Sequence, residues 1–275
     1  MSAAAFEVCR MDAISTPRTP LAAWMRPGFA RIGQTLIALI ALCIVGAATP
    51  AQAAGLSVAP ISVQFAPNEA VQGLWLSNSD NRALRAQIRV FAWTQDNGED
   101  RLEPSTALVV SPPMLSVAAG QRQFVRLVRP GGRDAPREQS YRLLIDELPE
   151  AGAGRPGLSF VMRYSVPVFI GTPAGAVAPP QWSLTPATDG APRLQAHNHA
   201  ARRLQLSELE IVGAQDQVLY RQAGLLGYVL AGSHRQWPLP LPATAVNQAR
   251  EIRVRIDGER VVQAWPAPAV VGTAR

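Results

Sequence analysis

The sequence predicts an all-β protein built from two consecutive β-sandwiches, and three features support this fold class. Short segments in which apolar and polar residues alternate recur from residue 55 to 171 and again from Trp182 onward. Turn-forming residues separate them, and the chain is rich in proline and glycine, with 24 and 21 copies. Residues 55–171 contain no long segment with the 3.6-residue period of an amphipathic helix.

The first unit has the pattern of an antiparallel sandwich. Between Arg85 and Val90 the apolar residues Ala86, Ile88 and Val90 alternate with polar ones, so one face of this strand is expected to be buried. Many short strands in one unit of this length are typical of a two-sheet sandwich. We expect them at residues 56–58, 63–65, 74–76, 86–90, 108–110, 124–128, 141–145 and 158–170.

A stretch of small residues and proline, Gly171–Pro180, is expected to separate the two units. This places the N-terminal sandwich at residues 54–172 and the C-terminal sandwich at residues 173–275. Strands of the second unit are expected at residues 194–198, 204–212, 217–221, 227–230 and 252–256.

Residues 1–53 are expected to be a leader and signal peptide that is removed on export. Arg26 and Arg31 precede an apolar run at residues 35–48, which is too short to span a bilayer comfortably. Ala51-Gln52-Ala53 then supplies the small-x-small pattern of a cleavage site.

The mature chain is expected to begin at Ala54 and to lack cysteine, because Cys9 and Cys43 both lie in the leader. Disulfides, thiol nucleophiles and thiolate metal sites are thereby excluded from the mature protein. Translation starts at Met1 or Met25. The alternatives to cleavage are an anchoring helix and lipid attachment at Cys43.

The charge of the chain argues against a nucleic-acid partner. The full chain has a formal net charge of +6; removal of the leader, with its four arginines and two acids, leaves a mild net charge of +4 on the mature chain, and the export signal points away from nucleic acid as well. All 26 basic residues are arginine, since the sequence contains no lysine. Any positive site must therefore consist of guanidinium groups, which bind carboxylates in bidentate fashion.

No motif for catalysis, a cofactor or a small-molecule substrate is present. The sequence lacks a Gly-x-Ser-x-Gly elbow, a P-loop and a His-Glu-x-x-His pair. His197 and His199 have the spacing of two ligands on one strand face, but no further His or Cys is near them in the sequence, so no metal site is predicted. Asn78 and Asn198 are expected to form side-chain hydrogen bonds at strand ends.

Six segments spread over nearly the whole mature chain stand out. They are QIRVFAW at 87–93, LVVSPP at 108–113, QFVRLVR at 123–129, YRLLIDELP at 141–149, YSVPVF at 164–169 and GYVLAGSHRQW at 227–237. In this order they resemble the PapD-like periplasmic chaperones of pilus assembly. The resemblance implies two immunoglobulin-like sandwiches, no enzymatic activity, pilin subunits as clients and an outer-membrane usher as a further partner.

In this family the last strand of the first domain completes the client's unfinished sandwich. The equivalent strand here is residues 158–170, whose alternate positions are all apolar or aromatic. Residues 166–170 are expected to pack in the chaperone's own core, the alternative being that the whole strand does so. The preceding residues 150–157 are expected to form a mobile loop. The apolar edge strand 158–170 could drive self-association of the free protein. The expected client-binding residues are Leu158, Phe160, Met162 and Tyr164.

The family also holds the client's C-terminal carboxylate with a pair of basic residues, and here the sequence departs from the best-known branch. In that branch the pair is an arginine on the first strand and a lysine on the last strand of the first domain. Here Ser62 occupies the first-strand position, and the chain has no lysine. The resemblance is therefore to the divergent, archaic branch. Arg142 is the first choice for the carboxylate anchor, Arg163 the second and Arg126 the third; each is alternatively a solvated strand arginine.

A rival interpretation is an exported structural β-sandwich subunit or adhesin of a surface fibre. Such subunits begin with an extended donor segment, whereas Ala54 leads directly into a strand, and they rarely carry a second complete sandwich. The sequence therefore favours the chaperone.

Overall fold

A computed structural model describes residues 55–131, 137–149, 161–171, 178–185, 191–242 and 247–265. Apart from a 3₁₀ turn at Ala214–Asp216, every regular element in these residues is a β-strand, as the sequence predicts. No helix in these ranges is long and apolar enough to cross a membrane.

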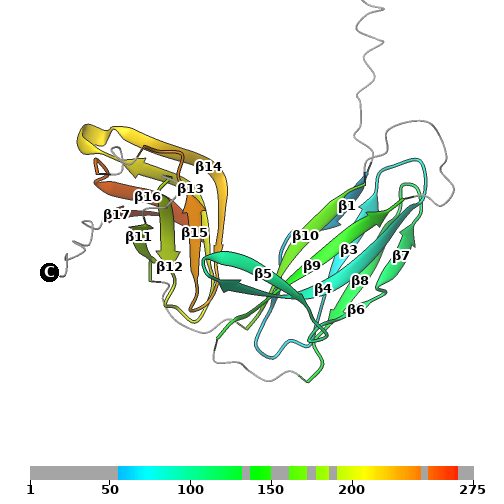
Figure 1. The fold of residues 1–275 in the computed structure, drawn as a ribbon. Coiled ribbons are helices and arrows are strands. Elements are labelled where there is room, and N and C mark those ends of the chain that lie inside the picture. Colours follow the sequence, from blue (N-terminus) through cyan, green and yellow to red (C-terminus); the bar gives the residue numbers. More distant parts are fainter. Residues whose placement is uncertain are drawn as a thin grey trace, which may run out of the picture. The chain divides into compact units, whose positions relative to one another are not determined.

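The first ten strands form two sheets around one core (Figure 1). One sheet has the order β1-β3-β8-β6; the other has the order β2-β10-β9-β4-β5, with β7 beside β4. Neighbouring strands are antiparallel except β2 and β10, which are parallel. The bounds are β1 Leu56–Ala59, β2 Val63–Phe65, β3 Val71–Asn78, β4 Leu84–Asp96, β5 Glu99–Pro104, β6 Val109–Ser111, β7 Met114–Val117, β8 Arg122–Val128, β9 Gln139–Leu148 and β10 Arg163–Ile170.

The first core lies between these two sheets and follows the predicted alternation. Leu74 and Leu76 of β3 are fully buried, as are Leu143 and Ile145 of β9, while the residues between them are more exposed. Because successive side chains of a strand point to opposite faces, every second residue enters the core.

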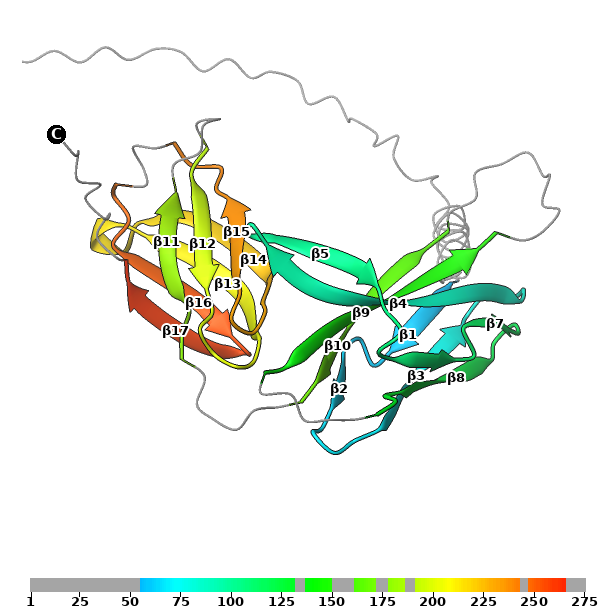
Figure 2. The same cartoon turned by 60° about the horizontal axis from the view of Figure 1, so that its bottom comes forward.

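The remaining strands form a second sandwich with its own core (Figure 2). The order is β11-β12-β15 in one sheet and β14-β13-β16-β17 in the other. Leu194 of the first sheet and Leu206 and Ile252 of the second are fully buried in that core. The bounds are β11 Gln181–Thr185, β12 Arg193–His197, β13 Leu204–Val212, β14 Val218–Val229, β15 His234–Pro238, β16 Glu251–Ile256 and β17 Glu259–Ala264.

Several strand predictions need correction. The two strands expected at residues 217–221 and 227–230 are the single strand β14, which Gly224 and Gly227 bend with positive φ angles of 74° and 146°. No strand was expected at the positions of β5, β7, β11, β15 and β17. In β5 every residue is exposed, so it has no alternation to detect.

The strand expected at residues 158–170 is β10, and it begins only at Arg163. Residues 150–160, the leader 1–53 and the domain boundary at residues 172–173 fall wholly or partly outside the described residues, so these bounds stay predictions.

One buried asparagine ties a loop to its sheet in each sandwich, as expected at these strand ends. Asn78 Oδ1 accepts a hydrogen bond from Asp80 N at 2.8 Å, and Asn198 Oδ1 accepts one from Ala200 N at 2.9 Å. Each Nδ2 donates to three carbonyl oxygens: those of Arg82, Val117 and Ala118 for Asn78, and those of Arg202, Val229 and Leu230 for Asn198.

Candidate functional site

The strand β10 has an open backbone edge along its first half. It pairs with β9 over its whole length, Arg163–Ile170, but with β2 only at Val168–Ile170. In the part of the chain that the structure describes, no strand pairs with Arg163–Pro167 on the side away from β9. Such an edge presents N–H and C=O groups to which another strand can bind.

The core-facing side chains of β10 change from buried to exposed toward the start of the strand. Val166, Val168 and Ile170 belong to the first core, as predicted, and Tyr164 packs against it. Met162, two residues earlier, is 51% exposed. The row of alternating apolar residues therefore continues past the edge of the protein's own core.

The remaining predicted client-binding residues are placed differently. Tyr164 donates its hydroxyl hydrogen to the carbonyl oxygen of Leu56 on β1, so it links the two sheets of its own sandwich. Burial, and next the charge of Glu147, raises the pKa of Tyr164. Leu158 and Phe160 lie outside the described residues.

Arg142 lies on β9, directly opposite Pro167 at the end of the open edge. Its guanidinium carbon is 3.7 Å from the ring centre of Trp93 and 5.8 Å from that of Tyr228. Burial lowers the pKa of Arg142, against the opposing charge of Asp100. Within the described ranges the Arg142 side chain has no hydrogen bond and no ion pair.

Asp100 does not neutralise Arg142 by direct contact, because it has other partners. Its Oδ1 accepts a hydrogen bond from Gln95 at 2.9 Å, and its Oδ2 is 3.4 Å from Arg235. Arg142 is therefore a half-buried cation held by aromatic rings, with its donors available. An exogenous carboxylate could accept two parallel hydrogen bonds from such a guanidinium group.

Trp93 and Tyr228, the two rings next to Arg142, belong to a cluster of four apolar residues. Trp93 and Phe169 come from the first sandwich, and Tyr228 and Leu230 from the second. Their rings contact one another, with centroids 5.9 Å apart for Trp93–Phe169 and 5.6 Å for both Trp93–Tyr228 and Phe169–Tyr228. Low-dielectric surroundings of this kind strengthen any ion pair that Arg142 forms.

Residues 55–176 match a family model described as pili and flagellar-assembly chaperone, PapD N-terminal domain. The first sandwich is therefore similar to the N-terminal domain of the PapD chaperone family. This is a family of chaperones and not of enzymes. No curated protein sequence matches the chain.

The two-sandwich fold of this protein is similar to solved structures of pilus chaperones. A chain of the complex between chaperone CsuC and tip subunit CsuE, from archaic chaperone–usher Csu pili of Acinetobacter baumannii, is 27% identical with a TM-score of 0.61; the match covers 76% of this protein and 97% of that chain. This similarity supports a chaperone role.

Two further structures share the fold at lower identity. The E. coli chaperone DraB is 20% identical with a TM-score of 0.52, and the match covers 78% of this protein and 97% of DraB. The complex of the SafA pilin with the SafB chaperone from Salmonella enterica gives 17% identity and a TM-score of 0.53, covering 77% of this protein and 96% of that chain.

The other two candidate anchors of this PapD-type domain lie in different surroundings. Arg163, on the open strand itself, is ion-paired with Asp146, which also accepts a hydrogen bond from Arg89 at 2.7 Å. Although burial raises the pKa of Asp146, these hydrogen bonds bring it below its usual value. Arg126 is exposed on β8, in the other sheet. Of the three candidate arginines, Arg142 alone is half-buried, has guanidinium donors without a partner among the described residues, and lies beside the open edge of β10.

Sequence reasoning overlooked Trp93 and Tyr228 as site residues. Both lie inside the segments that carry the family resemblance, 87–93 and 227–237, so a signal was present. Their meeting at Arg142 depends on the contact between two sandwiches, which no local pattern encodes.

A second link between the PapD-type sandwich and its neighbour was also not foreseen. Arg203 Nη1 donates to Glu138 Oε2 at 2.6 Å and to Gln64 Oε1 at 3.0 Å, and its guanidinium carbon lies 3.6 Å from the ring centre of Phe169. The Glu138 side chain is fully buried. Burial raises the pKa of Glu138, with the charge of Arg203 as the largest opposing effect.

The histidines gather in the second sandwich. The ring centroids of His197 and His199 are 4.0 Å apart, and His234 lies 6.1 Å from His197. Burial, and next the charges of the other two histidines, lowers the pKa of His197. Among the residues with described positions, no group of three His, Cys, Asp or Glu is arranged to hold a metal ion.

Proposed function

We propose that this protein is a periplasmic chaperone that captures pilin subunits by donor-strand complementation and delivers them to an outer-membrane usher. The observation that carries the proposal is the open edge of β10 ending beside the half-buried Arg142, whose side chain has no hydrogen-bond or ion-pair partner among the described residues.

The edge supplies the backbone part of the interaction. A client that lacks one strand of its sandwich gains hydrogen bonds along Arg163–Pro167 and receives apolar side chains at alternate positions. Met162 is the exposed member of that row in the described residues, and Phe160 and Leu158 continue it in the sequence.

The point at which the edge closes determines where the client ends. From Val168 onward β2 occupies the edge, so a client strand bound to β10 has to stop opposite Pro167. Arg142 lies across from Pro167 on β9. A client strand running parallel to β10, as β2 does, would therefore bring its C-terminal carboxylate to the guanidinium group of Arg142.

Co-expression with a pilin subunit tests the proposal. Arg142→Ala should abolish pilin co-purification, and Arg142→Lys should restore it in part, because a point charge returns without the fork. Arg163→Ala is the matched control and should retain the client, since Arg163 already has Asp146 as its partner. Normal capture by Arg142→Ala with failure of Arg163→Ala would move the anchor to the last strand.

Two further results bear on compartment and class. The intact mass of the periplasmic form should correspond to a chain that begins at Ala54.

The exposed Met162 next to β10 gives the free chaperone a surface for self-association, so its oligomeric state should change on client binding. Homopolymers without a client would favour the fibre-subunit interpretation instead.

A further inference from the structure

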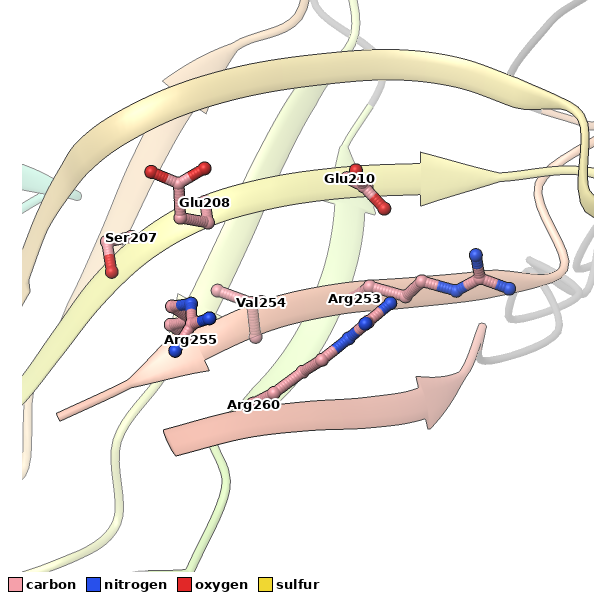
Figure 3. A pocket seen from close by; sticks show the side chains of 7 residues that line it. All are labelled: Ser207, Glu208, Glu210, Arg253, Val254, Arg255 and Arg260. Carbon is pink, nitrogen blue, oxygen red and sulfur yellow. The ribbon is translucent and has the colours of Figure 1, made fainter. Parts of the chain in front are cut away.

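A polar hollow lies on the second sandwich, over the sheet β14-β13-β16-β17 and apart from the proposed client site. It has a volume of about 460 Å³. Figure 3 shows Glu208 and Glu210 on the β13 side and three arginines on the β16 and β17 side. The lining residues are Ser207, Glu208, Glu210, Arg253, Val254, Arg255 and Arg260.

One row of residues across this sheet has its charges balanced. Glu210 on β13 lies opposite Arg253 on β16, and it forms an ion pair with Arg221 on β14 at 2.7 Å. Arg253 forms ion pairs with Glu251 and Asp216. The acids and arginines of this row therefore satisfy one another.

The neighbouring row contains donors without an acid. Ser207 on β13 lies opposite Arg255 on β16, which lies opposite Arg260 on β17. Among the residues with described positions, Arg255 Nη1 donates only to the carbonyl oxygen of Gly258, at 2.9 Å. Arg260 has no side-chain hydrogen bond or ion pair to any described residue.

Two acids adjoin this row in the sequence, Glu208 beside Ser207 and Glu259 beside Arg260, and neither forms an ion pair with a described residue. Glu208 lies at a β-bulge with a φ of 52°, and its Oε1 accepts a hydrogen bond from Gly224 N at 2.8 Å. Arg255 and Arg260 thus form a directly opposed pair of like charges, an arrangement that destabilises a sheet when nothing compensates it.

We propose that the row Ser207–Arg255–Arg260 binds a phosphate group. A tetrahedral dianion can accept hydrogen bonds from both guanidinium groups and from the serine hydroxyl, and its charge balances the two arginines. In Figure 3 the Arg260 side chain runs toward Arg253, whereas Arg255 stays beside Ser207.

The phosphate has two chemical sources, the free inorganic ion and a lipid headgroup, and two assays distinguish them. The first measures the rise in melting temperature with inorganic phosphate against chloride at matched ionic strength. The second measures sedimentation of the full chain with phosphatidylcholine vesicles that do or do not contain phosphatidic acid.

The variants Arg255→Gln and Arg260→Gln should each weaken the binding seen in these assays by roughly tenfold, the loss expected for one charge-assisted contact. Arg221→Gln is the matched control, because Arg221 lies on the same sheet but is paired with Glu210, and it should bind as the unaltered protein does. Without phosphate, Arg260→Gln should raise the melting temperature, because the repulsion with Arg255 is gone.

Each outcome decides the proposal. A response to free phosphate that the two row variants lose supports a solute site, and a response to the acidic vesicles alone supports a headgroup site. No response to either probe, or an equal response from Arg255→Gln, Arg260→Gln and Arg221→Gln, would overturn it. A lower melting temperature of Arg260→Gln without phosphate would also overturn it, because the arginine would then serve the fold.

Discussion

Replacing Arg142 by methionine should make the free protein more stable while it loses its client. Methionine keeps most of the length of the side chain and its apolar contacts with Trp93 and Tyr228, but it removes the charge. In the free protein that charge is half-buried without an acid partner among the described residues, and burial lowers its pKa. The environment therefore disfavours the cation until a carboxylate arrives.

The size of the effect follows from two opposing contributions. Holding a partly buried charge without a partner costs about 2 kcal/mol in this setting. The stacking of the guanidinium group on Trp93 at 3.7 Å returns about 1 kcal/mol. Arg142→Met should thus raise the free energy of unfolding by about 1 kcal/mol.

The same substitution at two other arginines should give different results, since their partners differ. Arg203 is bonded to the buried Glu138, and removing one member of a buried pair costs about 3–5 kcal/mol. Arg163 is mostly exposed and paired with Asp146, so Arg163→Met should cost at most about 1 kcal/mol. Arg142→Met is therefore predicted to be the most stable variant, Arg163→Met the next and Arg203→Met the least stable.

Urea unfolding of the three purified variants measures this order, and pilin co-purification reports function on the same samples. If Arg142→Met lowers the free energy of unfolding by more than about 1 kcal/mol, the arginine holds the fold and the argument for an available anchor fails. If it is stable and still captures the client, the carboxylate binds elsewhere.

Three further predictions concern the fold, the client strand and pH. Asn78→Ala and Asn198→Ala should each cost about 2–3 kcal/mol in urea unfolding, because each removes a buried amide whose carbonyl acceptors are partly or fully buried and lose their donor; a loss below about 0.5 kcal/mol would contradict this. Met162→Glu should weaken pilin capture by about tenfold or more with an unchanged melting temperature, since its side chain is 51% exposed in the free protein; unaltered capture would remove Met162 from the site. Burial raises the pKa of Glu138 in the folded state. Between the unfolded value of about 4.3 and this raised value, Glu138 is protonated in the folded protein but ionised in the unfolded chain. The free energy of unfolding therefore falls as the pH rises through that window. Glu138→Gln should remove that part of the slope when unfolding is measured from about pH 4 to pH 7, and an unchanged slope would count against the raised pKa.

The sequence was sufficient for the parts of the fold that depend on local periodicity. Alternation along β3, β4 and β9 identifies the buried face, and Leu74, Leu76, Leu143 and Ile145 are buried in the structure. The same reasoning failed for β5, which is exposed on both faces and pairs with β4 beyond a turn. A strand without a buried face leaves no alternation in the sequence.

The candidate site was only partly accessible to sequence reasoning. The family resemblance named Arg142 and the segment 158–170, which contains Met162, but the arginines 142, 163 and 126 look alike as residues on alternating strands. Composition showed only that the anchor had to be an arginine, because the chain has no lysine.

The tertiary structure distinguished these arginines, because their partners come from distant parts of the chain. Strand register places Asp146 beside Arg163, whereas it places Pro167 beside Arg142. The second sandwich then supplies Tyr228 to Arg142 instead of an acid. Which face a residue occupies follows from a period of two along its own strand, but which charge it meets depends on pairing and packing between segments far apart in the sequence.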